Sequence, residues 1–397
     1  PTTGVVTFSQ TNNIWHSNTG SLDEAATLTL ATADLLQVQQ TITDADGDSA
    51  SAAVNIGQNV FSIQDDGPNA ALNPEAALDT LVLDESAVGT DTALGTAPVG
   101  LASITANFAD NFSTAAYGTD GAGSTAYSLV LTGTNVGSGL YALDPTDTTV
   151  VGSDGIGQGS EILLNQSGNT ITGSVGSTNY FTISIAPTTG VVTFSQTNNI
   201  WHSNTGSLDE AATLTLATAD LLQVQQTITD ADGDSASAAV NIGQNVFSIQ
   251  DDGPNAALNP EAALDTLVLD ESAVGTDTAL GTAPVGLASI TANFADNFVA
   301  PVAYGTDGAG STAYSLVLSG TNVGSGLYNL DPTDTTVVGS DGIGQGSEIL
   351  LNQDAGTGVI TGSVGATNYF TISIAPTTGV VTFSQTNNIW HSNTGSL

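Results

Sequence analysis

The sequence predicts an all-β protein that consists of tandem β-sandwich modules, and three observations support this prediction. Short runs rich in Val, Ile, Thr, Tyr and Phe alternate with Gly, Asn, Asp and Ser, which is typical of strands joined by turns. Helical periodicity is nearly absent, since only residues 218–223 are suited to a single helical turn. The segment PTTGVVTFSQTNNIWHSNTGSL begins at residues 1, 187 and 376, so the chain repeats itself at offsets of 186 and 189 residues.

The repeat has the length of a globular module. Residues 1–64 are identical to 187–250, and residues 65–112 are identical to 251–298. A period this long is typical of modules that each have their own core, and not of a solenoid with turns of about 20–50 residues. The few differences add residues between strand-like runs, where loops tolerate insertions.

These boundaries divide the chain into three parts. We expect residues 1–64 to be the C-terminal part of a repeat, 65–250 a complete repeat, and 251–397 the N-terminal part of the next. The complete repeat has room for one large sandwich or for two smaller ones, because sandwiches often have about 100 residues. Because the chain begins and ends inside a repeat, we expect it to be a fragment of a longer protein.

The clearest predicted strands lie within the complete repeat. They cover residues 127–131, 171–175 and 180–185, where β-branched and aromatic residues are concentrated. The last of these runs leads through the sequence APTTG into residues 191–194. Proline and glycine in this connection favour a tight turn, so the two runs form a predicted hairpin.

Charge is the most unusual feature of the composition. The 397 residues include 39 Asp and Glu, three His, and no Lys or Arg, which gives a formal net charge of −39. A compact chain with this charge repels itself unless cations neutralise it. Because 40% of the residues are hydrophobic, the chain is nevertheless able to build a core, which argues against disorder throughout.

The composition also excludes several functions. Without Cys the chain has neither disulfides nor thiolate metal sites. Without Lys or Arg it has no cation for phosphate, so nucleic acid and anionic membranes are unsuitable partners. No apolar run is long enough for a transmembrane helix, and the N-terminal sequence PTTGVVTFSQ does not look like a signal peptide, so we expect no membrane insertion.

The first candidate metal site is the sequence TDADGDS, in which calcium would find three of the six to eight oxygens that it binds. It is not an EF-hand loop, because the twelfth position from the first aspartate is Asn55, where a bidentate glutamate is required. The turn must therefore recruit ligands from elsewhere in the chain; the alternative is a solvated acidic turn without a metal. The aspartates of the two copies are Asp44, Asp46, Asp48, Asp230, Asp232 and Asp234.

The second candidate site is the junction between repeats, marked by the sequence DDGP. The proline prevents pairing inside a sheet, so a module is expected to end here. The sequence LDES follows and adds a further acidic pair, which we expect to gather with the DDGP acids around one junction. Calcium bound there would stiffen the hinge; the alternative is a plain acidic linker. The acids of this site are Asp65, Asp66, Asp84 and Glu85, and in the next copy Asp251, Asp252, Asp270 and Glu271.

A third acidic pair lies about 20 residues ahead of each triple-aspartate turn. It consists of Asp23 and Glu24, and of Asp209 and Glu210 in the next copy. Two acidic pairs in one repeat suggest two sandwich subdomains, an alternative that the sequence leaves open. Residues 65–250 hold 19 acids, enough for on the order of five calcium ions if each ion uses three or four carboxylates.

Catalysis is not expected. Each complete repeat has one Trp and one His, Trp201 and His202, and such a pair after a strand is more typical of packing than of chemistry. Paired carboxylates do catalyse glycoside hydrolysis, but near-identical active sites in tandem would be unusual. We therefore expect no enzyme and no small-molecule substrate.

Several motifs together resemble one family. The sequences TDADGDS, VNIG, FSIQDDGP and TGVVTFSQTNNIWH are similar to the long repeats of giant bacterial RTX adhesins, which type I systems secrete. The resemblance covers essentially the whole chain and implies extender modules, which are calcium-rigidified Ig-like or cadherin-like sandwiches that project an adhesive tip. It further implies an extracellular location on the bacterial cell surface, a role in adhesion and biofilms, several Ca²⁺ per repeat on the TDADGDS turns and DDGP junctions, and neighbouring repeats as partners.

The alternative is a module that itself binds carbohydrate or another cell in a calcium-dependent manner. Such a module would have an exposed aromatic cluster beside a carboxylate turn. The tyrosines are scattered instead, and Tyr117, Tyr141 and Tyr180 are expected in the core.

Overall fold

The computed structural model describes residues 3–17, 20–85, 102–149, 155–203, 208, 210–269, 271, 288–300, 304–305, 307–337 and 342–392. In this part the prediction of an all-β protein is confirmed. The helical elements among these residues are four short 3-10 turns: Ala33–Leu35, Phe108–Asn111, Ala219–Leu221 and Phe294–Asn297. No helix in the described ranges is long and apolar enough to cross a membrane.

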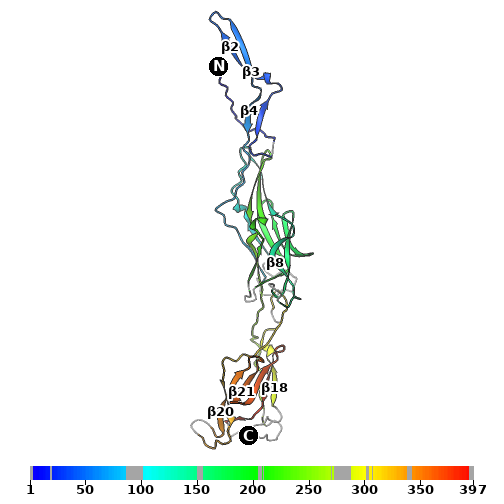
Figure 1. Cartoon of the computed structure of the whole chain (residues 1–397), viewed down its shortest axis with the longest axis vertical. Coiled ribbons are helices and arrows are strands. Elements are labelled where there is room, and N and C mark those ends of the chain that lie inside the picture. Colours follow the sequence, from blue (N-terminus) through cyan, green and yellow to red (C-terminus); the bar gives the residue numbers. More distant parts are fainter. Residues whose placement is uncertain are drawn as a thin grey trace. The chain divides into compact units, whose positions relative to one another are not determined.

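The chain folds into two compact units, whose strands are labelled in Figure 1. The first unit comprises Pro1–Gly253 together with Gly305–Gly308, and the second comprises Pro254–Tyr304 together with Ala309–Leu397. The boundary after Gly253 falls inside the second DDGP sequence, where the sequence predicts the end of a module.

A seven-stranded sheet is the largest element of the first unit. Its neighbouring strands are antiparallel, in the order β13-β8-β9-β10-β11-β12-β6. The predicted hairpin is confirmed, since Ile185 of β11 pairs with Val192 of β12 across the APTTG turn. The strands are β6 (Ser103–Asn107), β8 (Val136–Leu143), β9 (Gln158–Ser167), β10 (Thr170–Val175), β11 (Thr178–Ile185), β12 (Val191–Gln196) and β13 (Ile200–Trp201).

Two three-stranded sheets complete this module. One has the order β14-β17-β5 and the other the order β16-β15-β7. In both, strands from the last third of the repeat pair with strands from its beginning: β17 pairs with β5 in parallel, and β15 pairs with β7 antiparallel. The strands are β5 (Leu81–Asp84), β7 (Ala122–Leu131), β14 (Ala211–Thr215), β15 (Leu222–Asp230), β16 (Ser235–Asn241) and β17 (Gln244–Gln250).

The three sheets share one hydrophobic core. Buried and half-buried positions alternate strictly along β15, as expected for a strand with one face on a core. Phe194 joins the sheets, because its ring contacts Phe181 at a centroid distance of 5.6 Å and Phe247 at 5.2 Å. The buried apolar residues from Leu81 to Ile249 form a single cluster, so the described part of residues 65–250 is organised around one core.

The N-terminal copy of the last third of the repeat has different surroundings. Its strands pair only in twos, β1 with β4 and β2 with β3, and most of its side chains are exposed. Phe8 is 47% exposed, whereas its counterpart Phe194 is 0% exposed. The same sequence thus buries its apolar face only when the strands of residues 81–185 accompany it. The strands are β1 (Ala25–Thr29), β2 (Gln37–Thr43), β3 (Ser49–Asn55) and β4 (Gln58–Gln64).

The second unit repeats the seven-stranded sheet in the order β18-β23-β22-β21-β20-β19-β24. Its paired strands β20 and β21 lie side by side in orange in Figure 1. Residues 309–318 repeat the sequence of β7 but do not form a strand. The strands are β18 (Ser289–Asn293), β19 (Val323–Leu330), β20 (Gln345–Gln353), β21 (Ile360–Val364), β22 (Thr367–Ile374), β23 (Val380–Gln385) and β24 (Ile389–Trp390).

Candidate metal centre at the repeat junction

Three acids meet at one edge of the β14-β17-β5 sheet. Glu210 precedes β14, whereas Asp251 follows β17 and Glu85 follows β5. Because β14 runs antiparallel to β17 and β5 runs parallel to it, these three positions come to the same edge, about 4.8 Å apart from strand to strand. The backbone confirms the proximity, since the Asp251 N–H donates to the Glu210 carbonyl at 2.9 Å.

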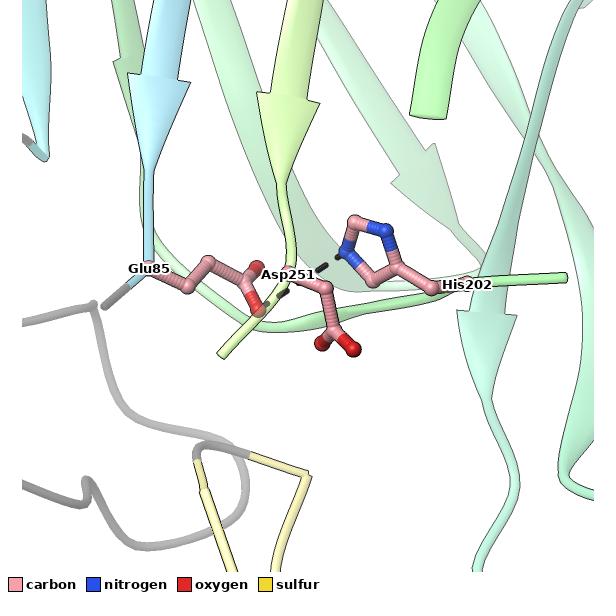
Figure 2. A group of neighbouring side chains, drawn as sticks. All are labelled: Glu85, His202 and Asp251. Carbon is pink, nitrogen blue, oxygen red and sulfur yellow. Dashed lines mark ion pairs between the residues drawn. The ribbon is translucent and has the colours of Figure 1, made fainter. Parts of the chain in front are cut away.

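His202 joins this edge from the end of the larger sheet. Figure 2 shows β5 and β17 ending side by side, with His202 approaching Glu85 and Asp251. The three side chains are buried, and one ligand atom from each lies within 4.8 Å of the others. His202 Nε2 is 3.8 Å from Glu85 Oε2, and Gln196 donates a hydrogen bond to the other oxygen of Glu85.

The protonation state of His202 follows from its burial. Burial lowers the pKa of His202 to about 4, although a hydrogen bond with the Glu210 backbone opposes this. The imidazole is therefore neutral at physiological pH and offers a lone pair to a cation. Trp201 packs edge to face on Tyr141 and donates its indole N–H to Ile156 at 2.9 Å, as expected for a packing residue. His202 is buried too, but it also belongs to a group that could hold a metal, which the sequence analysis did not consider. The single histidine at a fixed place in each repeat was the available signal.

A second group of acids comes from the β16-β15-β7 sheet. Asp120 precedes β7, and the turn between β15 and β16 carries the three aspartates of TDADGDS. Because Asp230 pairs with Ala122, Asp120 comes to the same edge as this turn. Asp230 Oδ1 accepts from the backbone N–H groups of Gly233 at 3.1 Å and Asp234 at 2.9 Å, which fixes the turn.

This second group meets Glu24 and Asp65 at the first junction. Asp234 clusters with Glu24 and Asp65, and Asp65 also clusters with Asp120 and Asp232; within each set the ligand atoms lie within 4.8 Å. The turn thus lies close to carboxylates from elsewhere in the chain. Several of these oxygens are buried and accept no hydrogen bond from an amide or a hydroxyl group, namely both of Glu24, both of Asp65, and one each of Asp120, Asp232 and Asp234.

The pKa values show how strongly these carboxylates repel one another. Burial, a hydrogen bond with Asp65 and the negative charges nearby raise the pKa of Asp234 to about 7 and that of Asp120 to about 6. Burial also acts to raise the pKa of Asp65, but the hydrogen bonds from Asp120 and Asp234 outweigh it and leave this pKa lowered. Without a cation the cluster therefore holds protons, and a bound divalent cation would replace them.

The same arrangement recurs at the second junction. Burial and then the charges of Asp251, Glu210 and Asp252 raise the pKa of Asp307 to about 7. Asp307 has the repeat position of Asp120, so each junction brings a residue of this type to its acids. At the first junction the counterpart of His202 is His16, whose backbone N–H donates to Asp232 at 3.2 Å.

The donor set fits calcium. Calcium prefers six to eight oxygen ligands, mainly carboxylates and carbonyls. The first junction brings together two groups of three carboxylates that share Asp65, and several of their buried oxygens accept no hydrogen bond from an amide. Glu24, Asp65 and Asp234 form one group that would hold an ion, and Asp65, Asp120 and Asp232 form the other. A bound cation would supply the positive charge that the sequence lacks. Without a cation, burial of several carboxylates side by side would lower the free energy of unfolding.

One expectation about the junction was wrong. The sequence suggested that Asp84 and Glu85 join Asp65 and Asp66, but the structure brings Glu85 to Asp251. The reason is the parallel pairing of β5 with β17, which carries Glu85 to the junction at the other end of the repeat. In the second unit Glu271 likewise approaches His391, with Oε2 and Nε2 3.6 Å apart.

The remaining predicted ligands have various positions. Asp44, Asp46 and Asp48 cluster on an exposed turn, where hydrogen bonds with Asp46 and with the backbone lower the pKa of Asp44. Asp23 and Asp66 are exposed, and Asp84 and Asp252 are half-buried. In the pairs Asp23-Glu24 and Asp84-Glu85, the glutamate therefore belongs to an acidic cluster and the aspartate does not. Asp209 and Asp270 lie outside the described residues.

Comparison with known proteins agrees with the division into repeats. No curated protein matches the chain. The model of one family, described as a domain of unknown function (DUF5801), matches residues 1–57, 80–243 and 266–397, and its middle match nearly coincides with the module from β5 to β17. The chain therefore belongs to this family of domains of unknown function, DUF5801.

Proposed function

We propose that the chain is a structural spacer whose modules are held together and stiffened by Ca²⁺ at their junctions. The observation that carries this proposal is the convergence of Glu24, Asp65 and Asp234, three acids distant in sequence, around buried oxygens in a chain without Lys or Arg. An ion held by residues from both sides of a junction removes freedom from the linker, because bending would break its coordination.

The biological setting proposed is the extender region of a large bacterial adhesin. The similarity of this chain's motifs to the repeats of RTX adhesins supports this setting. The proposal includes an extracellular location on the bacterial surface and neighbouring repeats as partners. Near-identity of the copies also supports a spacer, since length and stiffness depend on the number of modules and not on their individuality. The Ig-like or cadherin-like class of sandwich stays a prediction.

Substitution of Asp234 by Asn tests the site. Asn has almost the same shape as Asp but no charge. When calcium is bound, Asp234→Asn removes a carboxylate ligand of the ion. Without calcium, it removes a negative charge that repels the neighbouring carboxylates. We expect the variant to bind fewer Ca²⁺ in a calorimetric titration and to melt at a lower temperature than the parent in calcium. In chelator we expect the reverse order, with the variant melting higher.

The matched control is Asp79→Asn, which changes the same charge at an exposed position outside the clusters. It should leave the calcium titration unchanged and should not reverse its effect between calcium and chelator. If Asp234→Asn and Asp79→Asn behave alike in both conditions, the junction is not a calcium site.

Carbohydrate binding is the second candidate function. The rings of Tyr141 and Trp201 meet edge to face, with their centroids 6.0 Å apart. Both residues line a surface hollow, together with Ser203. Half-buried aromatic rings of this kind are able to stack on a sugar. A glycan array probed in calcium tests this function: reproducible binding that Trp201→Ala removes would favour a lectin-like module over a pure spacer.

A further inference from the structure

The imidazole of His202 is buried in the complete module without a partner for its Nε2 atom. His202 is 8% exposed, and its Nε2 atom makes no hydrogen bond with any of the described residues. The 3.8 Å between Nε2 and Glu85 Oε2 is too long for one. Burial of a polar atom without a partner costs free energy, so this nitrogen requires a physical explanation.

The imidazole approaches two buried carboxylates. Figure 2 shows His202 reaching from the larger sheet toward Glu85 and Asp251, which follow β5 and β17. Glu85 is 0% exposed and Asp251 is 7% exposed, and one ligand atom of each residue lies within 4.8 Å of the other two. A neutral imidazole with two carboxylates carries a charge of −2, which one divalent cation would balance.

The ligand chemistry of this group differs from that of the acidic clusters. Calcium takes six to eight oxygens, whereas imidazole nitrogen is a preferred ligand of Zn²⁺ and related transition metals. In a tetrahedral zinc site with bonds of about 2.1 Å, neighbouring ligand atoms lie about 3.4 Å apart. The 3.8 Å between His202 Nε2 and Glu85 Oε2 is within about 0.4 Å of that spacing. Three protein ligands with one water molecule is a known coordination of zinc.

We propose that Glu85, His202 and Asp251 bind a transition-metal ion of the zinc type, separate from the calcium proposed for the acidic clusters. The ion would tie the end of the seven-stranded sheet to the ends of β5 and β17, and so would lock the closure of the module. Gln196 donates a hydrogen bond to the other oxygen of Glu85, which orients this carboxylate as residues around metal ligands commonly do.

The second unit repeats part of this arrangement. Gln385 donates a hydrogen bond to Glu271, and His391 Nε2 is 3.6 Å from Glu271 Oε2. Among the described residues of this unit no third ligand joins these two, and the side chain of His391 is 66% exposed. Two ligands at an exposed position hold an ion more weakly than three buried ones, so His391 provides an internal reference for His202.

Calorimetric titration of the full chain with Zn²⁺ in excess calcium tests the proposal, because calcium then occupies the sites that prefer it. We expect one tight zinc site per chain and a higher melting temperature when zinc fills it. His202→Gln keeps a polar side chain of similar length but removes the imidazole. It should lower the affinity for zinc by more than about 100-fold, because loss of a residue that merely orients a ligand already costs about 10–100-fold.

The matched control is His391→Gln, which removes the same residue type at the same repeat position. This variant should keep the tight zinc site and the rise in melting temperature that zinc causes. Equal zinc binding by the parent and by His202→Gln would overturn the proposal, and so would displacement of the bound zinc by excess calcium. Failure of the calcium proposal would leave these results unchanged, because Asp234 and its turn contribute no ligand to this group.

A measurement on the unchanged chain makes the test independent of how the variants fold. The chain has three histidines, so ¹⁵N labelling of histidine gives a simple NMR spectrum, which single His→Gln variants assign. The first equivalent of Zn²⁺ should shift the Nε2 resonance of His202 and leave those of His16 and His391 in place. Equal shifts of all three histidines, or no shift of any, would show that zinc binds elsewhere on this acidic chain, and the proposed site would be wrong.

Discussion

A carboxylate of this chain has no Lys or Arg to pair with, so protons, polar contacts and metal ions are what balance its charge. On the exposed turns, backbone and hydroxyl hydrogen bonds suffice. The Thr146 hydroxyl and the Thr146 N–H both donate to Asp144 and lower its pKa. At the first junction the acids are buried together, and the raised pKa values of Asp120 and Asp234 record the unbalanced charge. The junction is thus where a cation has the most to contribute.

The raised pKa values of the buried junction acids predict an unusual dependence of the folded protein's stability on pH. The folded-state pKa values of about 6 for Asp120 and about 7 for Asp234 and Asp307 lie above the ordinary value of 3.8. Between about pH 4 and pH 7 these three carboxyls bind more protons in the folded protein than in the unfolded chain. His202, with a pKa lowered to about 4, acts in the opposite direction, but three groups outweigh one. Without calcium the stability of the fold therefore falls as the pH rises through this range. With calcium bound the oxygens need no proton, so the fall should be much smaller.

Denaturant unfolding at a series of pH values, with calcium and after its removal, measures this dependence. The Asp234→Asn variant should show a shallower fall than the parent without calcium, since one of the titrating groups is gone. Stability of the calcium-free protein that rises with pH from 4 to 7 would contradict the assigned pKa shifts.

At the scale of the element, strand β5 links the core to the junction. Its four residues pair with β17, bury Leu81 and Leu83, and place Glu85 beside Asp251. The pairing is parallel and joins the two ends of a repeat, so it closes the module. In the second unit, residues 267–269 repeat the first three residues of β5 and form no strand.

Substitution of Leu81 by Ala should therefore destabilise the first module. Leu81 is 0% exposed, and removal of such a side chain from a core costs about 2–5 kcal/mol of the free energy of unfolding. Val82→Ala, at the next position on the half-buried face, is the control and should cost much less. Equal losses in a denaturant titration would show that β5 is not held against the core as described.

The sequence predicted those features that depend on local pattern. The hairpin around the APTTG turn, the turn of Asp230 to Asp234 and the end of a module near Gly253 all follow from neighbouring residues. Strand pairing across a repeat has no local signal, so the contacts of Glu85 and of Asp120 with their clusters were not predictable. The proximity of His202 to Glu85 and Asp251 was not predictable for the same reason, since it depends on where β5 and β17 end.

At the scale of the whole molecule, the repeat is a unit of both folding and charge compensation. A module closes when the end of the repeat pairs with its beginning, and its junction acids come from consecutive segments. If the proposed calcium sites have the affinity of known extracellular modules, their dissociation constants are about 10⁻⁴–10⁻³ M. Binding at a concentration 100 times the dissociation constant stabilises a fold by about 2.7 kcal/mol per site, so several sites per chain would dominate its stability.

The central claim is that calcium at the junctions stiffens the array, and small-angle X-ray scattering of one sample in calcium and after chelation tests it most directly. We predict an extended particle with a well-defined maximum dimension in calcium, and a flexible particle with a broad distribution of distances after chelation. Scattering curves that are the same in both conditions would contradict the account.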